Sequence, residues 1–147
     1  MKSILIVILL SPLICFSQGN IEKGVNTIHV ADVSFNQVVD RLLDAGYYIE
    51  KIDSNFQTIK TEFKNGGVKN KLNKFRLFIR VKDSLAIITG QFYNTYLLGT
   101  KLFGVEQTIE NSTNPIANKS GNQKSCFNEM NTFAMSFNKP TTYSISK

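Results

Sequence analysis

The residues that could perform nucleophilic or metal chemistry are few and far apart. His29 is the single histidine of the 147-residue chain, and the two cysteines are Cys15 and Cys126. A cysteine protease needs a histidine base, and a zinc site needs several imidazole or thiolate ligands, so neither residue set is present. The HExxH, P-loop, G-x-S-x-G and G-x-G-x-x-G motifs are also missing from the sequence. We therefore interpret His29 as a structural strand residue and Cys126 as a core residue, and we predict no metal and no cofactor.

Two pairs of carboxylates have spacings that a glycoside hydrolase could use, since that chemistry needs only two suitably placed acids. Asp40 and Asp44 lie one helical turn apart, but on the polar side of an amphipathic stretch. Glu106 and Glu110 flank a polar segment. Neither pair has the apolar setting that a general acid needs near neutral pH, so we expect no enzymatic activity.

Positive charge is the strongest departure from a uniform sequence. The chain has 17 Lys and Arg against 11 Asp and Glu, a net charge of +6, and eight of the bases lie between Lys60 and Lys82 beside one acid, Glu62. Within 74–82, apolar residues alternate with bases, and alternate side chains of a strand project from one face. The predicted basic face comprises Lys74, Arg76, Phe78, Arg80 and Lys82.

Two interpretations of this basic face are open. It is either a solvated outer face whose charges oppose aggregation, or a surface that binds lipid headgroups, acidic envelope polysaccharide or an acidic protein. Phe78 favours the second interpretation, because it is an apolar side chain with no core to join. Nucleic-acid binding is not expected, since no stacking-aromatic motif accompanies the bases.

Two amphipathic helices are predicted to position these residues. The first runs over 34–46, where Ser34 and Gln37 form a capping box and Gly46 allows Tyr47 to fold back onto Leu42. The second covers 123–137 and is expected to end at Pro140. The apolar faces are predicted to be Phe35, Val38, Val39, Leu42 and Leu43 in the first helix and Cys126, Met130, Phe133 and Phe137 in the second.

The strands are predicted from alternation of apolar and polar residues. A short strand is expected at 27–30, followed by a hairpin of 47–53 with 56–64. A second hairpin joins 74–82 to 85–93 through Asp83-Ser84, and another pairing segment is expected within 96–109. The segments 65–70 and 111–123 are rich in Asn, Ser and Gly and are expected to be loops, with 141–147 as a tail.

These elements predict an α+β fold. It consists of an antiparallel sheet of four to five strands with two helices on one face, in the order β-α-β-β-β-β-α. The hydrophobic fraction of 42% and the charged fraction of 19% are typical of a globular domain, and no internal boundary is visible. We expect a single domain over 18–147.

Residues 1–17 have the pattern of a secretory signal peptide. Lys2 precedes the apolar run Ile4–Leu10, and Cys15 and Ser17 are small residues at the positions that a signal peptidase reads. Cleavage after Ser17 would leave Gln18 as the first residue, one cysteine and no membrane span. Lipid attachment at Cys15 and an uncleaved anchor are the alternatives. We expect export to the periplasm or the extracellular space, where Asn111 and Asn118 would be N-glycosylation sites only in a glycosylating host.

The predicted order of elements, over most of residues 26–137, resembles the small helix-grip domains of gram-negative envelope lipoproteins, including those of the outer-membrane assembly machinery. The resemblance lies in the pattern of elements and carries no functional residue to this chain. It implies a non-enzymatic envelope module.

The leading functional hypothesis is therefore an exported binding module whose basic face meets an anionic envelope component or an acidic protein. One alternative is a carrier of a small apolar ligand, held in a cavity between the sheet and the C-terminal helix. Another is an inhibitor of a secreted hydrolase, with 65–73 as its wedge. Salt separates the first two, because binding to a charged surface weakens with ionic strength and binding in an apolar cavity does not.

Overall fold

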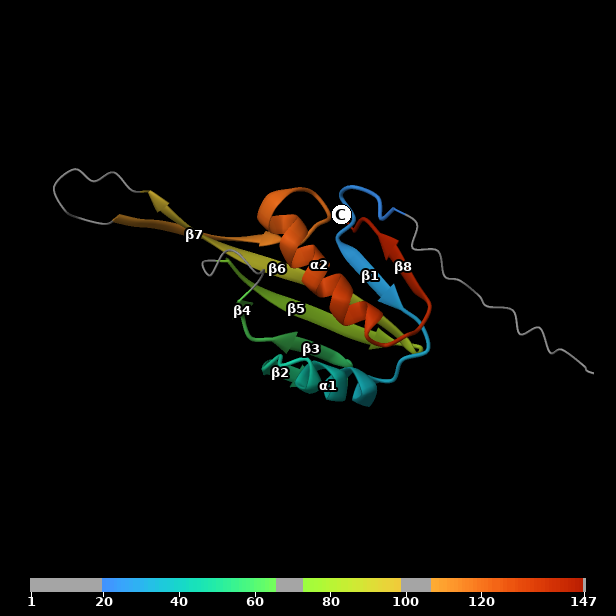
Figure 1. Cartoon of the computed structure of the whole chain (residues 1–147). Helices are drawn as coiled ribbons and strands as arrows, with labels where there is room; N and C mark the ends of the chain where they lie inside the picture. The colour runs from blue at the N-terminus through green and yellow to red at the C-terminus, as the bar shows by residue number, and fades with distance from the viewer. Residues whose placement is uncertain (1–19, 66–72, 99–106, 147) are drawn as a thin grey trace, which may run out of the picture.

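The computed structural model describes residues 20–65, 73–98 and 107–146 (Figure 1). The expected signal peptide, most of the 65–73 segment and Glu106 lie outside this part of the chain. The elements are β1 (Thr27–Val30), α1 (Phe35–Asp44), β2 (Ile49–Asp53), β3 (Thr58–Thr61), β4 (Lys64–Asn65), β5 (Asn73–Lys82), β6 (Leu85–Leu98), β7 (Gln107–Pro115), α2 (Gly121–Met135) and β8 (Thr141–Ser144).

The prediction of an α+β fold with an antiparallel sheet is confirmed, but the predicted number of strands is wrong. Within the described residues, eight strands form one sheet in the order β2-β3-β5-β6-β1-β8, with β4 paired to β5 and β7 paired to β6. The long strand β6 organises the sheet. One edge pairs with β5 from Leu85 to Asn94, while the other edge pairs first with β1 and then with β7.

Two of the additional strands come from segments that were expected to be loop or tail. Asn111 to Pro115 belongs to β7, and Thr141 to Ser144 forms β8 beside β1. Both segments are polar, yet their backbones pair with strands that are already in place, and the threonine and tyrosine residues of β8 favour extended structure. A strand therefore follows α2, so the order of elements that resembled helix-grip domains differs from the order in the structure.

The first helix is built as its sequence predicts. The side chain of Ser34 accepts a hydrogen bond from the backbone of Gln37, and the Gln37 side chain accepts one from the backbone of Ser34. At the other end Gly46 has φ +70°, and Tyr47 N donates to Leu42 O at 2.9 Å. One expectation is wrong, because Leu43 lies at the margin of the apolar face and is 56% exposed.

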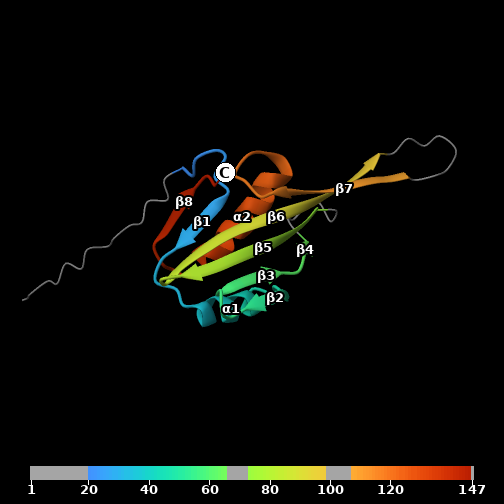
Figure 2. The same cartoon turned by 180° about the vertical axis from the view of Figure 1, so that it is seen from behind.

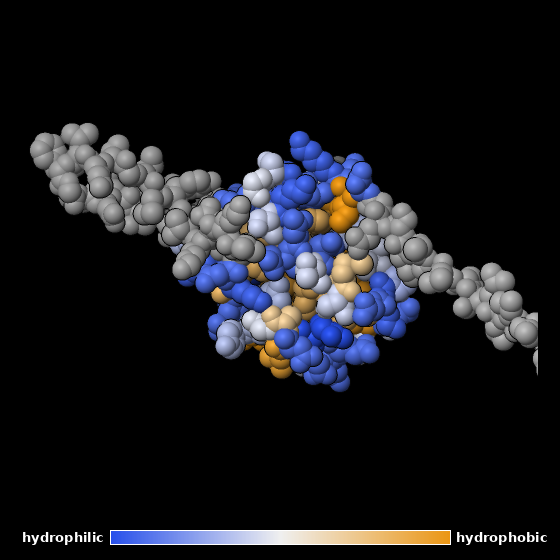
Figure 3. All heavy atoms as spheres, viewed as in Figure 1, coloured by the Kyte–Doolittle hydropathy of each residue, from blue (hydrophilic) through white to orange (hydrophobic). Residues whose placement is uncertain are grey.

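The core lies between α2 and the sheet. Figure 1 shows α2 crossing β5 and β6, and Figure 3 shows that the outer surface on this side is mainly hydrophilic. The predicted helix face is confirmed for Cys126, Met130 and Phe133, but the helix ends at Met135, before Pro140. The largest fully buried side chains include Phe75, Leu77, Ile79, Ile28, Ile88, Phe127 and Met130.

The hairpin between β5 and β6 sets which side chains leave this core. Asp83 and Ser84 have φ values of 51° and 60°, as expected for the two central residues of a tight hairpin turn. The turn places Lys82 opposite Leu85 and Arg80 opposite Ile87. It therefore brings the outward side chains of the two longest described strands together on the sheet face away from α2.

Candidate functional site

Figure 2 shows the sheet face opposite α2, which we call the open face. In β5, the alternate residues Phe75, Leu77, Ile79 and Val81 are buried in the core. Lys74, Arg76, Phe78, Arg80 and Lys82 occupy the other set of positions, and each of them is exposed or half-buried. The prediction that these five side chains share one face is confirmed.

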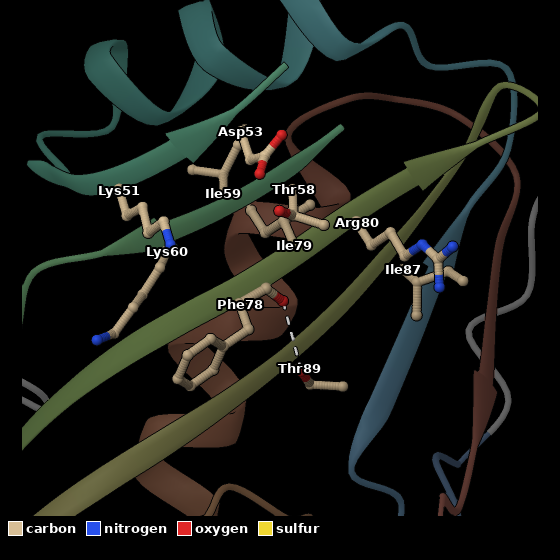
Figure 4. Close-up of a pocket in the computed structure, with 10 residues that line it drawn as sticks. All are labelled: Lys51, Asp53, Thr58, Ile59, Lys60, Phe78, Ile79, Arg80, Ile87 and Thr89. Carbon is tan, nitrogen blue, oxygen red and sulfur yellow. Dashed lines mark hydrogen bonds between the residues drawn. The ribbon is translucent and has the colours of Figure 1, made fainter. Parts of the chain in front are cut away.

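Strand register aligns side chains from four strands on this face. One row across the sheet places Lys51 opposite Lys60, Lys60 opposite Phe78 and Phe78 opposite Thr89. The neighbouring row contains Asp53, Thr58, Arg80 and Ile87 in the same manner. A groove of about 300 Å³ lies along these two rows, and its apolar lining residues are Phe78 and Ile87 together with Ile59 and Ile79 (Figure 4).

Arg76 is engaged in contacts within the protein and is not a free cation. Its guanidinium lies 4.5 Å from the ring centre of Phe63 and 5.2 Å from that of Phe78. It donates to Gln91 Oε1 at 3.0 Å and reaches Glu50 Oε2 at 3.4 Å. Phe78 was predicted to be an apolar contact with no partner in the core, and in the structure it is one of the rings that hold Arg76.

Glu50 links Arg76 to a second base. Lys60 Nζ lies 2.6 Å from Glu50 Oε1, so this carboxylate pairs with both Lys60 and Arg76. The pKa of Glu50 is lowered first by the hydrogen bond from Lys60, with the charges of Lys60 and Arg76 acting in the same direction and partial desolvation opposing them. Two of the eight clustered bases are thus partly neutralised by one acid.

Lys64 makes contacts within the protein near the end of α1. Its ammonium group donates to Ala45 O at 2.7 Å, at the C-terminal end of α1, and lies 4.3 Å from the ring centre of Tyr47. A cation at this end complements the helix dipole. Lys69 and Lys71 are outside the described residues, so the exposed bases that remain in the cluster are Lys74, Arg80 and Lys82.

Several groove residues are not predicted from the sequence. Lys51 is an exposed base outside the predicted cluster, and Asp53, Thr58, Ile87 and Thr89 also line the groove. A register shift between Ile49 and Lys51 explains why simple alternation does not assign the face of Lys51. The signal that could have found the others is the two-residue turn, which fixes the pairing of β5 with β6.

The candidate catalytic residues are not brought together. His29 is half-buried in β1, with Nε2 2.8 Å from Ser144 Oγ, and Cys126 is 1% exposed in the core. Burial, with the Glu129 carboxylate as a second cause, raises the pKa of the Cys126 thiol to about 11. Asp40 and Asp44 are exposed on α1 beside Arg41 and Lys139. Among the described residues, no group of three His, Cys, Asp or Glu side chains could hold a metal ion.

Asn118 of the second glycosylation pattern is part of the structure's internal bonding. Its side-chain amide donates to Ile21 O at 2.9 Å and to Glu22 O at 3.0 Å. Its backbone also pairs with Gly24 and Val25. The side-chain nitrogen that a glycan would occupy therefore holds the segment that leads into β1.

No helix in the described part of the chain has the length and hydropathy needed to cross a bilayer. No protein-family model matches this sequence, and comparison with curated proteins finds no significant match.

Proposed function

We propose that this protein is an exported, non-enzymatic binding module whose open face docks on an acidic polysaccharide of the cell envelope. The observation that carries the proposal is the groove, in which the exposed bases Lys51 and Arg80 line the same hollow as the apolar side chains Phe78 and Ile87. An apolar floor accepts the less polar face of a sugar ring, while basic side chains pair with its carboxylates.

The spacing of the bases favours a polymer over a ligand with one charged end. The exposed bases Lys51 and Arg80 come from β2 and β5, and Lys60, which also pairs with Glu50, lies on β3 between these two strands. Adjacent strands are about 4.8 Å apart, which is comparable to the length of one sugar residue. A polyanion whose charges recur along its chain would meet these bases in turn.

The other two functional hypotheses have less support. The interface between the sheet and α2 is filled by core side chains that include Phe75, Phe127, Met130 and Phe133. A carrier would have to displace some of them. The wedge of the inhibitor hypothesis lies almost wholly outside the described residues, and we do not propose either function.

A charge-reversal pair tests the proposal. Arg80→Glu with Lys82→Glu changes the charge of the open face by four units at positions that are exposed in the structure. Lys119→Glu with Lys124→Glu makes the same change at the start of α2, on the other side of the sheet. Binding to polygalacturonate at low salt should weaken about tenfold or more in the first variant, because an affinity change of that size needs only about 1.4 kcal/mol.

The outcomes separate the interpretations. Equal losses in the two variants would show that only net charge matters, and the basic face would then be a solvated surface. Binding to vesicles rich in anionic lipid, without binding to polygalacturonate, would assign the face to lipid headgroups. If wild-type protein binds neither probe at low salt, where attraction between charges is strongest, the proposal fails.

A further inference from the structure

Exposed apolar side chains collect at one edge of the sheet. Within the described residues, five large apolar side chains are exposed, and four of them lie between 43 and 56: Leu43, Tyr48, Ile52 and Phe56. Tyr48 is 75% exposed directly before β2, and Phe56 is 71% exposed in the turn that follows it. These four residues lie on α1, directly before β2, in β2 and in the turn after it.

β2, the strand that carries Ile52, is an edge strand of the sheet. β2 pairs with β3 on one side, and no described strand pairs with its other side. An edge strand presents unpaired N–H and C=O groups, and natural proteins usually protect such edges with proline, bulges or charge. β2 carries a register shift after Ile49 and the charged residues Glu50, Lys51 and Asp53, and the exposed Ile52 lies between Lys51 and Asp53 near the C-terminal end of the strand.

We propose that two copies of this chain pair antiparallel through β2, about a two-fold axis at Ile52. This register places Ile52 opposite Ile52 of the second copy, and it places Lys51 opposite Asp53 twice. Lys51 and Asp53 both line the groove on the open face, so the opposite charges project to the same side. Ile52 pairs with the buried Ile59 and so faces the other side of the sheet.

Charge complementarity selects this register over its neighbours. Centring the pair on Lys51 sets two ammonium groups opposite each other, and centring it on Asp53 sets two carboxylates opposite each other. Like charges directly across a strand pair are destabilising, whereas opposite charges and apolar pairs stabilise.

The symmetry has a consequence for the open face. A two-fold axis perpendicular to an antiparallel pair keeps the two sheets facing the same way. The two open faces would then form one continuous basic surface, and a polyanion could contact both. Lys51 takes part in both proposals, but Arg80 and Lys82, which the binding test changes, lie in β5 and not in β2, so the two proposals can fail separately.

Cross-linking tests the register directly. In a Cys15→Ser background, Ile52→Cys should form an intermolecular disulfide on mild oxidation, because directly opposite residues are close enough for one. Tyr48 is more exposed than Ile52, but its two copies would lie at opposite ends of the pair, so Tyr48→Cys should not cross-link to itself. Cys126 is buried and should stay silent. Equal cross-linking of the two variants, or none in Ile52→Cys, would overturn the register.

Sedimentation gives the second readout. Wild-type protein should show a concentration-dependent dimer, and Ile52→Lys should weaken that dimer about tenfold or more, a loss of about 1.4 kcal/mol. Ile145→Lys adds the same charge at the fifth exposed apolar residue, which follows β8, and should leave the dimer unchanged. A wild-type protein that stays monomeric at every concentration, or a dimer that survives Ile52→Lys, would refute the proposal. Neither result bears on the polysaccharide assay, which uses variants outside β2.

Discussion

Ile116 occupies the space that any side chain on Gly90 would need. A β-carbon at Gly90 would lie 2.6 Å from Cδ1 of Ile116 and 2.9 Å from the carbonyl oxygen of Arg76. The backbone holds this approach in place, since Ile116 N donates to Gly90 O at 2.9 Å. Gly90 therefore lets the segment between β7 and α2 close the core against β6.

Gly90→Ala should destabilise the protein by about 1 to 3 kcal/mol, as expected for overpacking of a filled core. Ile116→Val, which removes the nearest methyl group, should cost about 0.5 to 1.5 kcal/mol alone. In the double variant the total loss of stability should be smaller than the sum of the two single losses, because Ile116→Val relieves part of the overpacking that Gly90→Ala introduces. Urea unfolding of the four proteins measures this, and strict additivity would contradict the contact.

The second prediction separates two arginines that share the open face. Arg76→Ala should cost about 1 to 2 kcal/mol, since it loses ring contacts with Phe63 and Phe78 and an ion pair with Glu50. Arg80→Ala should stay within about 0.5 kcal/mol, as is typical of an exposed side chain. Thermal unfolding of both variants measures the two losses of stability. Similar losses would mean that Arg76 is as free as Arg80.

The parts of this site that could be predicted from the sequence are those that neighbouring residues in the chain determine. The capping box and the glycine stop of α1 lie within a few residues of the helix, so its boundaries were predictable. Alternation in β5 likewise sufficed to place Arg76 and Arg80 on one face. The engagement of Arg76 was not predictable, because Glu50 is 26 residues away in the sequence and Phe63 lies in a different segment.

β8 was not predicted for the same reason, since its pairing depends on residues far away in the sequence. Thr27 pairs with Ser144, and Ile28 pairs with Tyr143, so β8 depends on a partner near the other end of the chain. Local composition therefore made 141–147 look like a tail. In β2 the register shift after Ile49 turns Lys51 toward the open face, where alternation counted from Ile49 would place it on the core side.

The third prediction concerns pH. Because the pKa of Glu50 is lowered in the folded protein, its pairs with Lys60 and Arg76 stabilise the fold above the unfolded-state pKa of about 4.3. That contribution is lost as the pH falls through the lower folded-state pKa. Wild type should therefore be more stable than Glu50→Gln at pH 7, and the difference should shrink in acid. Urea melts across this range measure it, and a difference independent of pH would exclude a role for the charge.

The last prediction concerns Cys126, which the structure makes a poor nucleophile. Burial raises the pKa of its thiol to about 11, so at neutral pH the reactive thiolate is scarce as well as inaccessible. In a Cys15→Ser background, native protein should react with a thiol-specific disulfide reagent far more slowly than protein in urea. The reaction of the native protein should follow the opening of the fold, so Gly90→Ala should accelerate it. Rapid labelling of native wild type would instead place Cys126 at an accessible site and reopen the possibility of thiol chemistry.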